Sequence, residues 1–117
     1  LYNSEIVKLA QKSSLDTGSQ IKEGVYCWTL GPAYETPDEV KFIQGLGGDA
    51  VGMSTVPEIQ MAGTLGMTTL GISCLTNYAA GITKNELTHQ EVIETANNVK
   101  KQFSELVSNI LIHVNTN

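Results

Sequence analysis

Two polar side chains in this sequence stand where they could hold a flat nitrogen heterocycle. Glu35 lies in the stretch GPAYET, and its two carboxylate oxygens could accept hydrogen bonds from ring N–H and amino groups. A carboxylate just before a helix is equally common for electrostatic reasons, so a solvated side chain is the alternative. Asn77 offers a donor and an acceptor and could bridge two positions of a purine ring, although asparagine here is usually a turn residue.

A third stretch could hold an anion. Ser54 and Thr55 precede a predicted helix, where free backbone N–H groups and the positive end of the helix dipole favour negative charge. Simple capping by Thr55 is the alternative, and both hold if Ser54 faces the ligand while Thr55 caps. Met53 beside them is expected in the core, or else as a soft apolar wall of a pocket.

The other candidate residues have ordinary structural explanations as well. Tyr26 and Tyr34 are expected to pack, or to line a sugar or base pocket, and His89 is either an isolated surface histidine or a partner for a sugar hydroxyl. The sequence contains no P-loop and no GxGxxG motif. Glycines near these stretches are therefore expected to relieve crowding rather than bind phosphate: Gly31, Gly52 and Gly71.

The elements that must position these residues alternate along the chain. Strands are predicted over residues 22–30, 49–53 and 67–75, with loops over 13–20 and 76–87. A first helix is predicted over 4–12, with Ser4 as the cap. A second runs from a capping box at Thr36 to Gly47, and a third from a similar helix start at Thr55 to Gly66. A fourth runs from Thr88 through Ile110. In the helix from Thr36, the buried stripe is expected to comprise Val40, Ile43 and Leu46.

This alternation predicts an α/β fold with a mixed or largely parallel sheet covered by helices. Residues 22–30 are apolar on both faces, so their strand is expected inside the sheet and covered on two sides. Such sheets bind ligands at the carboxyl ends of their strands, where residues 31–36, 52–58 and 76–77 would converge on one pocket.

Composition bounds the class of protein. A chain of 117 residues with 41% hydrophobic residues is expected to form a single globular domain, and a net charge of -5 argues against nucleic acid as the main partner. Cys27 and Cys74 are expected to be reduced, buried thiols of a cytosolic protein. No secretory signal is visible, and no apolar run approaches the roughly 18 residues of a membrane span. The start at Leu1, without a methionine, suggests a fragment.

Four stretches together resemble the trimeric purine nucleoside phosphorylases: residues 23–26 (EGVY), 31–36 (GPAYET), 49–58 (DAVGMSTVPE) and 76–77 (TN). The likeness runs from about Ile21 through Ile110. It implies that residues 1–117 are the carboxyl-terminal portion of a larger nucleoside phosphorylase domain with a phosphorylase/hydrolase-like fold. It also implies a cytoplasmic homotrimer that acts in purine salvage.

The resemblance implies a role for each matching residue. Glu35 and Asn77 are the catalytic positions: Glu35 holds the purine edge, and Asn77 bonds the base and stabilises it as a leaving group. Ser54 contacts phosphate. The implied substrate contacts also include residues at the base pocket, the ribose and its 5′-hydroxyl: Tyr26, Tyr34, Val51, Gly52, Met53 and His89. Tyr34 stands where some relatives have phenylalanine.

The implied reaction is phosphorolysis of purine (deoxy)ribonucleosides to free base and (deoxy)ribose 1-phosphate, with no metal or organic cofactor. Negative charge builds on the purine, and Glu35 and Asn77 hold the base through oriented hydrogen bonds, while phosphate attacks the anomeric carbon with inversion. Asparagine at Asn77 suggests 6-oxopurines such as inosine and guanosine, since the similar methylthioadenosine phosphorylases tend to have aspartate.

Most phosphate ligands of the family lie in its first half, and nothing in this sequence matches them. The chain alone is therefore expected to be inactive. Two alternatives remain open: a nucleosidase that uses water in place of phosphate, and a non-catalytic fragment that binds purines or only assembles with a partner.

Overall fold

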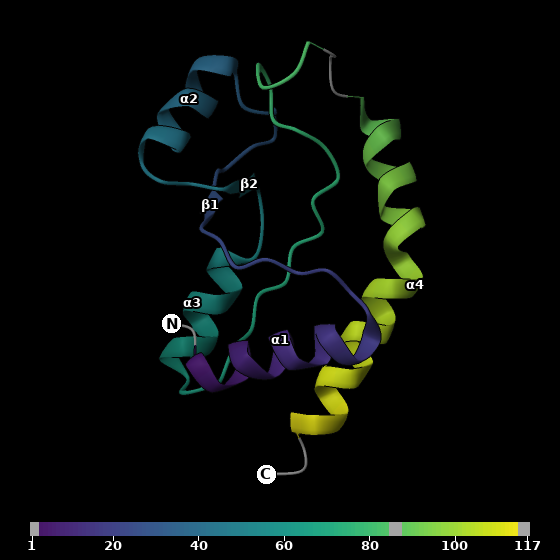
Figure 1. The fold of residues 1–117 in the computed structure, drawn as a ribbon. Coiled ribbons are helices and arrows are strands. Elements are labelled where there is room, and N and C mark those ends of the chain that lie inside the picture. Colours follow the sequence, from purple (N-terminus) through teal and green to yellow (C-terminus); the bar gives the residue numbers. More distant parts are fainter. Residues whose placement is uncertain (1–2, 85–87, 115–117) are drawn as a thin grey trace. The chain divides into compact units, whose positions relative to one another are not determined.

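The structure is a computed structural model that describes residues 3–84 and 88–114. Its elements are helices α1 (Ser4–Thr17), α2 (Pro37–Gly45), α3 (Val56–Thr64) and α4 (His89–Val114), with strands β1 (Tyr26–Trp28) and β2 (Ala50–Gly52) (Figure 1). They fall into two compact units. One comprises the described parts of Leu1–Lys22, Pro57–Ile72 and Asn98–Asn117, and the other comprises those of Glu23–Val56 and Ser73–Asn97.

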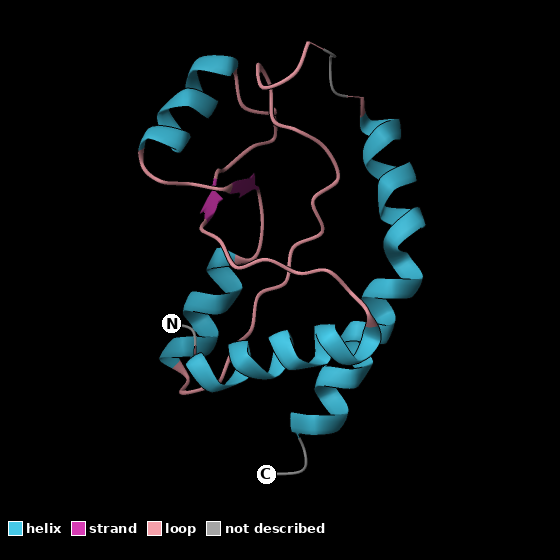
Figure 2. Cartoon of the chain, in the orientation of Figure 1, coloured by secondary structure: helices cyan, strands magenta, loops and turns pink. Residues whose placement is uncertain are grey.

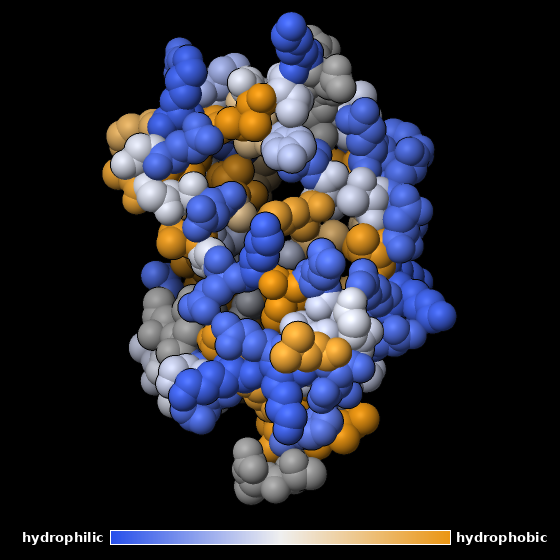
Figure 3. All heavy atoms as spheres, in the orientation of Figure 1, coloured by the Kyte–Doolittle hydropathy of each residue, from blue (hydrophilic) through white to orange (hydrophobic). Residues whose placement is uncertain are grey.

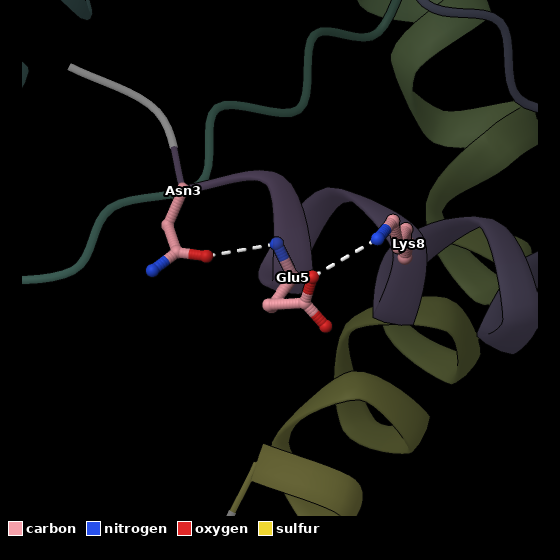
Figure 4. Close-up of polar contacts among 3 residues, drawn as sticks. All are labelled: Asn3, Glu5 and Lys8. Atoms are coloured by element: carbon pink, nitrogen blue, oxygen red, sulfur yellow. Dashed lines mark hydrogen bonds and ion pairs between the residues drawn. The ribbon is translucent and has the colours of Figure 1, made fainter.

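Helix α1 begins at Ser4, as predicted, and ends five residues later than predicted, at Thr17 rather than at residue 12. Asn3, not Ser4, is the cap: its Oδ1 accepts a hydrogen bond from the backbone N–H of Glu5 at 2.8 Å (Figure 4). The predicted loop from Ser13 is wrong up to Thr17, because hydroxyl groups of this polar segment bond carbonyls of the preceding turn. Thr17 Oγ1 donates to Ser13 O at 2.9 Å, for example. Gly18, with φ of 70°, then ends the helix.

The core of this first unit lies between α1 and the last turns of α4. Ala10, Leu106 and Ile110 are 2–4% exposed, and partly buried apolar side chains pack around them: Leu9, Ile21, Leu70 and Ile72. Helix α4 begins with the predicted capping box, in which the Thr88 N–H donates to Glu91 Oε2 and the Glu91 N–H donates to Thr88 Oγ1.

The second unit contains a parallel pair of strands joined by α2, as expected for an α/β fold. Tyr26, Cys27 and Trp28 pair with Ala50, Val51 and Gly52 in that order. The predicted capping box of α2 is confirmed, with Thr36 as the cap, Pro37 in the first turn and reciprocal bonds between Thr36 and Glu39. After the end of α2, the side chains of Cys27 and Ile43 lie against Gly48, where a Cβ atom would be 2.6 Å from Cys27 Sγ.

The strands are shorter than predicted, and the third is absent from the described residues. Residues 67–76 pair with no strand, and Figure 2 draws them as loop. A β-rich stretch becomes a strand only when another strand accepts its backbone hydrogen bonds, and the described chain offers none here.

The two-sided cover predicted for β1 is also not observed. Val25, Trp28 and Leu30 are 53%, 41% and 82% exposed. On the side of the molecule drawn in Figure 3, apolar side chains are exposed among hydrophilic ones. Leu46, expected in the buried stripe of α2, is 70% exposed, whereas Val40 is buried. These side chains are open because no other described segment packs over them.

The cysteines are free thiols, as predicted, but neither is buried: Cys27 is half-buried and Cys74 is exposed. In the described parts of the chain, no helix combines the length and the apolar character needed to cross a membrane.

Candidate functional site

Glu35 is held at the carboxyl end of β1 by Thr29. The Thr29 N–H donates to Gly52 O at 2.9 Å, which extends the parallel pairing one residue beyond β1. The Thr29 hydroxyl donates to Glu35 Oε1. Within the described residues, the other carboxylate oxygen, Oε2, makes no hydrogen bond. Glu35 is half-buried, and Oε2 keeps its capacity to accept a hydrogen bond.

Tyr26 connects β1 to the loop that follows β2. Its ring lies against Gly52, where a Cβ atom would stand 3.1 Å from Tyr26 Cζ. Its hydroxyl oxygen accepts a long hydrogen bond from the Ser54 N–H, with the two atoms 3.4 Å apart. Glycine at position 52 therefore relieves crowding, as predicted, and lets Tyr26 reach Ser54. Val51 is half-buried in β2 between Ala50 and Gly52.

Met53 joins the loops after the two strands. A Cβ atom at Gly31 would lie 2.5 Å from Met53 Sδ, and Gly31 has φ of 65°. Both the close approach and the backbone conformation favour glycine at this position. The half-buried Met53 side chain thus lies over the start of the stretch that carries Glu35.

The backbone at Thr55 has an unusual conformation. Its φ is 79°, in the left-handed region, and Thr55 is the one non-glycine residue of the described chain with positive φ. For a β-branched residue this conformation costs about 1–3 kcal/mol and is found most often at functional sites. The predicted capping role of Thr55 is not observed: its hydroxyl lies 3.1 Å from Ser54 Oγ, and the Val56 N–H donates to Ser54 O.

The loop that carries Asn77 meets the start of α2. A Cβ atom at Gly81 would lie 2.8 Å from Pro37 Cβ, two residues after Glu35. The Asn77 amide itself is exposed and is bonded locally. Its Oδ1 accepts from Thr76 Oγ1 at 2.6 Å, and its Nδ2 donates to Tyr78 O at 2.9 Å. Gly81 of this loop therefore lies against Pro37, but among the described residues no hydrogen bond joins the side chains of Glu35 and Asn77.

Tyr34 and His89 remain at the edge of this arrangement. Tyr34 is 53% exposed, and His89 is the exposed first residue of α4. Within the described segments, no hydrogen bond links either side chain to Glu35, Ser54 or Asn77.

Two features of this arrangement were missed by reasoning from the sequence: the side chain of Thr29 and the backbone conformation of Thr55. Thr29 bonds a residue six positions away, a spacing with no regular motif behind it. Its one signal is a single hydroxyl residue within the otherwise apolar stretch YCWTL, directly after β1. The backbone of Thr55 could not be foreseen, because threonine before a valine-proline pair is an ordinary helix start.

A separate hollow of about 440 Å³ lies beside α3 in the first unit. It is lined mainly by apolar side chains: Pro57, Glu58, Met61, Ala62, Leu65 and Met67. None of the predicted site residues borders it. We therefore assign the candidate site to the strand ends, where polar groups converge, and not to this open hollow. In the part of the chain that the structure describes, no three His, Cys, Asp or Glu side chains gather as metal ligands would.

Known proteins resemble this chain over nearly its whole length. It is 51% identical to purine nucleoside phosphorylase 1 of Geobacillus stearothermophilus and 48% identical to that of Bacillus subtilis, each over 110 residues and 94% of the chain. A crystal structure of a schistosoma purine nucleoside phosphorylase in complex with hypoxanthine superposes with a TM-score of 0.89 at 30% identity, over 94% of the chain.

The chain spans about two fifths of the length of these relatives: 40% and 41% of the two bacterial proteins and 41% of the schistosoma chain. Residues 1–112 match the Phosphorylase superfamily. The helices and the parallel strand pair agree with an α/β fragment of that fold. On this match, this chain belongs to the phosphorylase superfamily.

Proposed function

We propose that this chain supplies the base-binding and ribose-binding part of a purine nucleoside phosphorylase, a pentosyltransferase that cleaves purine nucleosides with inorganic phosphate. One observation carries the proposal: Glu35, with one carboxylate oxygen open, lies two residues before the contact between Pro37 and the Asn77 loop. The names of the relatives, two of which share about half of the aligned residues, support it.

In this proposal the purine lies between the stretches of Glu35 and Asn77. Glu35 Oε2 accepts a ring N–H of the base. The Asn77 amide gives up its local bonds to Thr76 and Tyr78 and bonds the purine instead. Tyr26, Val51 and Gly52 border the base, Met53 and Tyr34 pack on the ribose, and His89 bonds the 5′-hydroxyl. The half-buried positions of Tyr26, Val51 and Met53 support these roles.

The chemical step is displacement at the anomeric carbon. The glycosidic bond breaks, and its electron pair passes to the purine. The Asn77 amide stabilises this charge by donating a hydrogen bond, while Glu35 holds the ring N–H and keeps the base in place. Groups already oriented toward developing charge lower the barrier because they need no reorganisation during the reaction. A phosphate oxygen forms the new bond on the opposite face, which inverts the configuration and releases ribose 1-phosphate.

We assign one phosphate contact to this chain, at Ser54. The unusual backbone of Thr55 and the bond from the Ser54 N–H to Tyr26 support a shaped loop at this point. The remaining phosphate ligands lie outside this sequence. The isolated chain is therefore proposed to be inactive, as one part of a single larger domain.

The proposal also includes preferences and partners. Asn77 favours 6-oxopurine nucleosides such as inosine and guanosine over 6-aminopurines. The full-length protein is a cytoplasmic homotrimer that needs no metal or organic cofactor, with phosphate as its co-substrate. These points rest on the resemblance to the trimeric phosphorylases, and the net charge of -5 suits a protein without a nucleic-acid partner.

The test is phosphorolysis by the full-length protein that contains this sequence. Inosine is supplied with and without phosphate, and free hypoxanthine, ribose 1-phosphate and ribose are quantified. Ribose 1-phosphate formed only with phosphate supports the proposal. Ribose formed without phosphate indicates a nucleosidase, and no cleavage together with purine binding indicates a non-catalytic protein. Efficient phosphorolysis by the 117-residue chain alone would contradict the proposed inactivity.

A further inference from the structure

One contact of the second unit connects the end of β1 to Glu35: the hydrogen bond from the Thr29 hydroxyl. Thr29 is half-buried, and its position is fixed twice. Its N–H donates to Gly52 O at 2.9 Å, and its hydroxyl donates to Glu35 Oε1. Threonine has two heavy atoms on Cβ, which restricts rotation about χ1. The hydroxyl is therefore anchored to the sheet rather than to the mobile end of a long side chain.

This anchor determines what Glu35 can offer to a ligand. A glutamate with two free oxygens can turn about its terminal bond, and it can accept in several directions. With Oε1 engaged by Thr29, the open acceptor is Oε2, in one orientation. An ionised carboxylate accepts hydrogen bonds and donates none. The pair therefore presents a fixed acceptor that matches a ring N–H.

The chemistry of purines makes such an acceptor selective. A 6-oxopurine carries a hydrogen on N1 and can donate to it, whereas N1 of a 6-aminopurine is itself an acceptor. Two acceptors facing each other leave both groups unpaired, and a site built to receive a donor rejects a ligand that lacks one.

We propose that Thr29 is a positioning residue that orients Glu35 and thereby contributes to the preference for purines with an N1–H group. This inference rests on the proposed function. Thr29 itself touches no substrate and acts through the carboxylate of Glu35.

The test uses two variants of the full-length protein, Thr29→Val and Thr29→Ser. Valine keeps the branched shape and removes the hydroxyl, whereas serine keeps the hydroxyl. For Thr29→Val we expect the ratio of kcat/KM for inosine to that for adenosine to fall by about 10-fold or more, since hydrogen bonds to charged groups are among the strong ones. Thr29→Ser should stay within about 3-fold of the wild-type ratio. The thermal midpoints of both variants serve as the control for folding.

Each result has a distinct meaning. A lower ratio for Thr29→Val, with serine close to wild type and similar midpoints, supports the positioning role. An active wild-type protein whose ratio is unchanged in Thr29→Val overturns the role of Thr29 alone. Equal losses in both variants overturn it as well, since the hydroxyl would then not be the cause. A wild-type protein that cleaves no nucleoside overturns the proposed function and this inference together.

Discussion

The hydroxyl oxygen of Tyr26, on β1, lies 3.4 Å from the backbone nitrogen of Ser54 and accepts its N–H, so a side chain of one strand steadies the loop that follows the other. The ring reaches this point because Gly52 presents no side chain in its way. A single tyrosine thus links β1 to the loop that carries Ser54, the stretches for which base binding and phosphate binding are proposed.

Removal of the tyrosine hydroxyl should weaken phosphate binding more than base binding. In Tyr26→Phe the Ser54 N–H loses its partner, while the ring still packs on Gly52. Because the bond is long, we expect a modest effect, a rise in KM for phosphate of about 3-fold with a smaller change in KM for inosine. Steady-state kinetics of the full-length protein measure both. An equal rise in the two constants would contradict a specific link to Ser54.

A side chain at position 52 should destabilise the protein. In Gly52→Ala the new methyl group meets the Tyr26 ring, with Cζ at 3.1 Å and Cε2 at 3.2 Å, and one of the two must move. Overpacking of this kind costs about 1–3 kcal/mol of the free energy of unfolding. Gly45→Ala is the matched control, since nothing lies within 4 Å of its Cβ position and alanine favours the helix there. Urea unfolding that shows equal losses for both variants would disprove the predicted collision.

Glycine should be tolerated at position 55 but not at a matched position in α3. Thr55 has φ of 79°, so Thr55→Gly removes a steric conflict that offsets the loss of side-chain contacts. We expect the free energy of unfolding to stay the same or to rise by up to about 1 kcal/mol. Thr64→Gly, at the end of α3, should lower it by about 0.5–1 kcal/mol. The two values come from denaturant titrations, and a larger loss at position 55 than at 64 would refute the expectation.

Substitution of Asn77 should change the preferred base. An aspartate can only accept when ionised, so Asn77→Asp removes a donor from a group that otherwise offers both. In the full-length protein we expect preference to shift toward 6-aminopurines, with the ratio of kcat/KM for adenosine to that for inosine rising by about 10-fold or more. If inosine stayed as strongly favoured as before, the role proposed for Asn77 would be wrong.

Local features of the fold and the parallel pair of strands were predictable from the sequence, whereas the absence of the third strand from the described residues was not. The capping boxes at Thr36 and Thr88 involve residues three positions apart, so the sequence contains all that they need. The prediction of the third strand was wrong because a strand forms only when a partner strand elsewhere in the chain accepts its hydrogen bonds. The extension of α1 to Thr17 was missed because serine and threonine ordinarily mark loops, whereas here their hydroxyls bond the helix carbonyls.

The candidate site shows the same division. The rule that ligands bind at strand ends predicts that Glu35 and Asn77 hold one ligand. Gly81 lies against Pro37 in the structure, and a shared ligand of the two side chains stays a prediction. The partner of Glu35 was not foreseeable. The hydrogen bond from Thr29 to Glu35 spans six residues of irregular backbone and depends on how β1 pairs with β2. No periodic pattern in the sequence predicts such a bond.

The exposed apolar face of β1 also makes a built-in optical probe. Trp28 is the one tryptophan of the sequence, it is 41% exposed, and it directly precedes Thr29. Its indole fluorescence therefore reports from beside the residue that orients Glu35, without any label. When another polypeptide segment closes over that face, the emission should move to shorter wavelength, because the indole leaves water. Association at this surface can thus be followed over time by the fluorescence emission of Trp28.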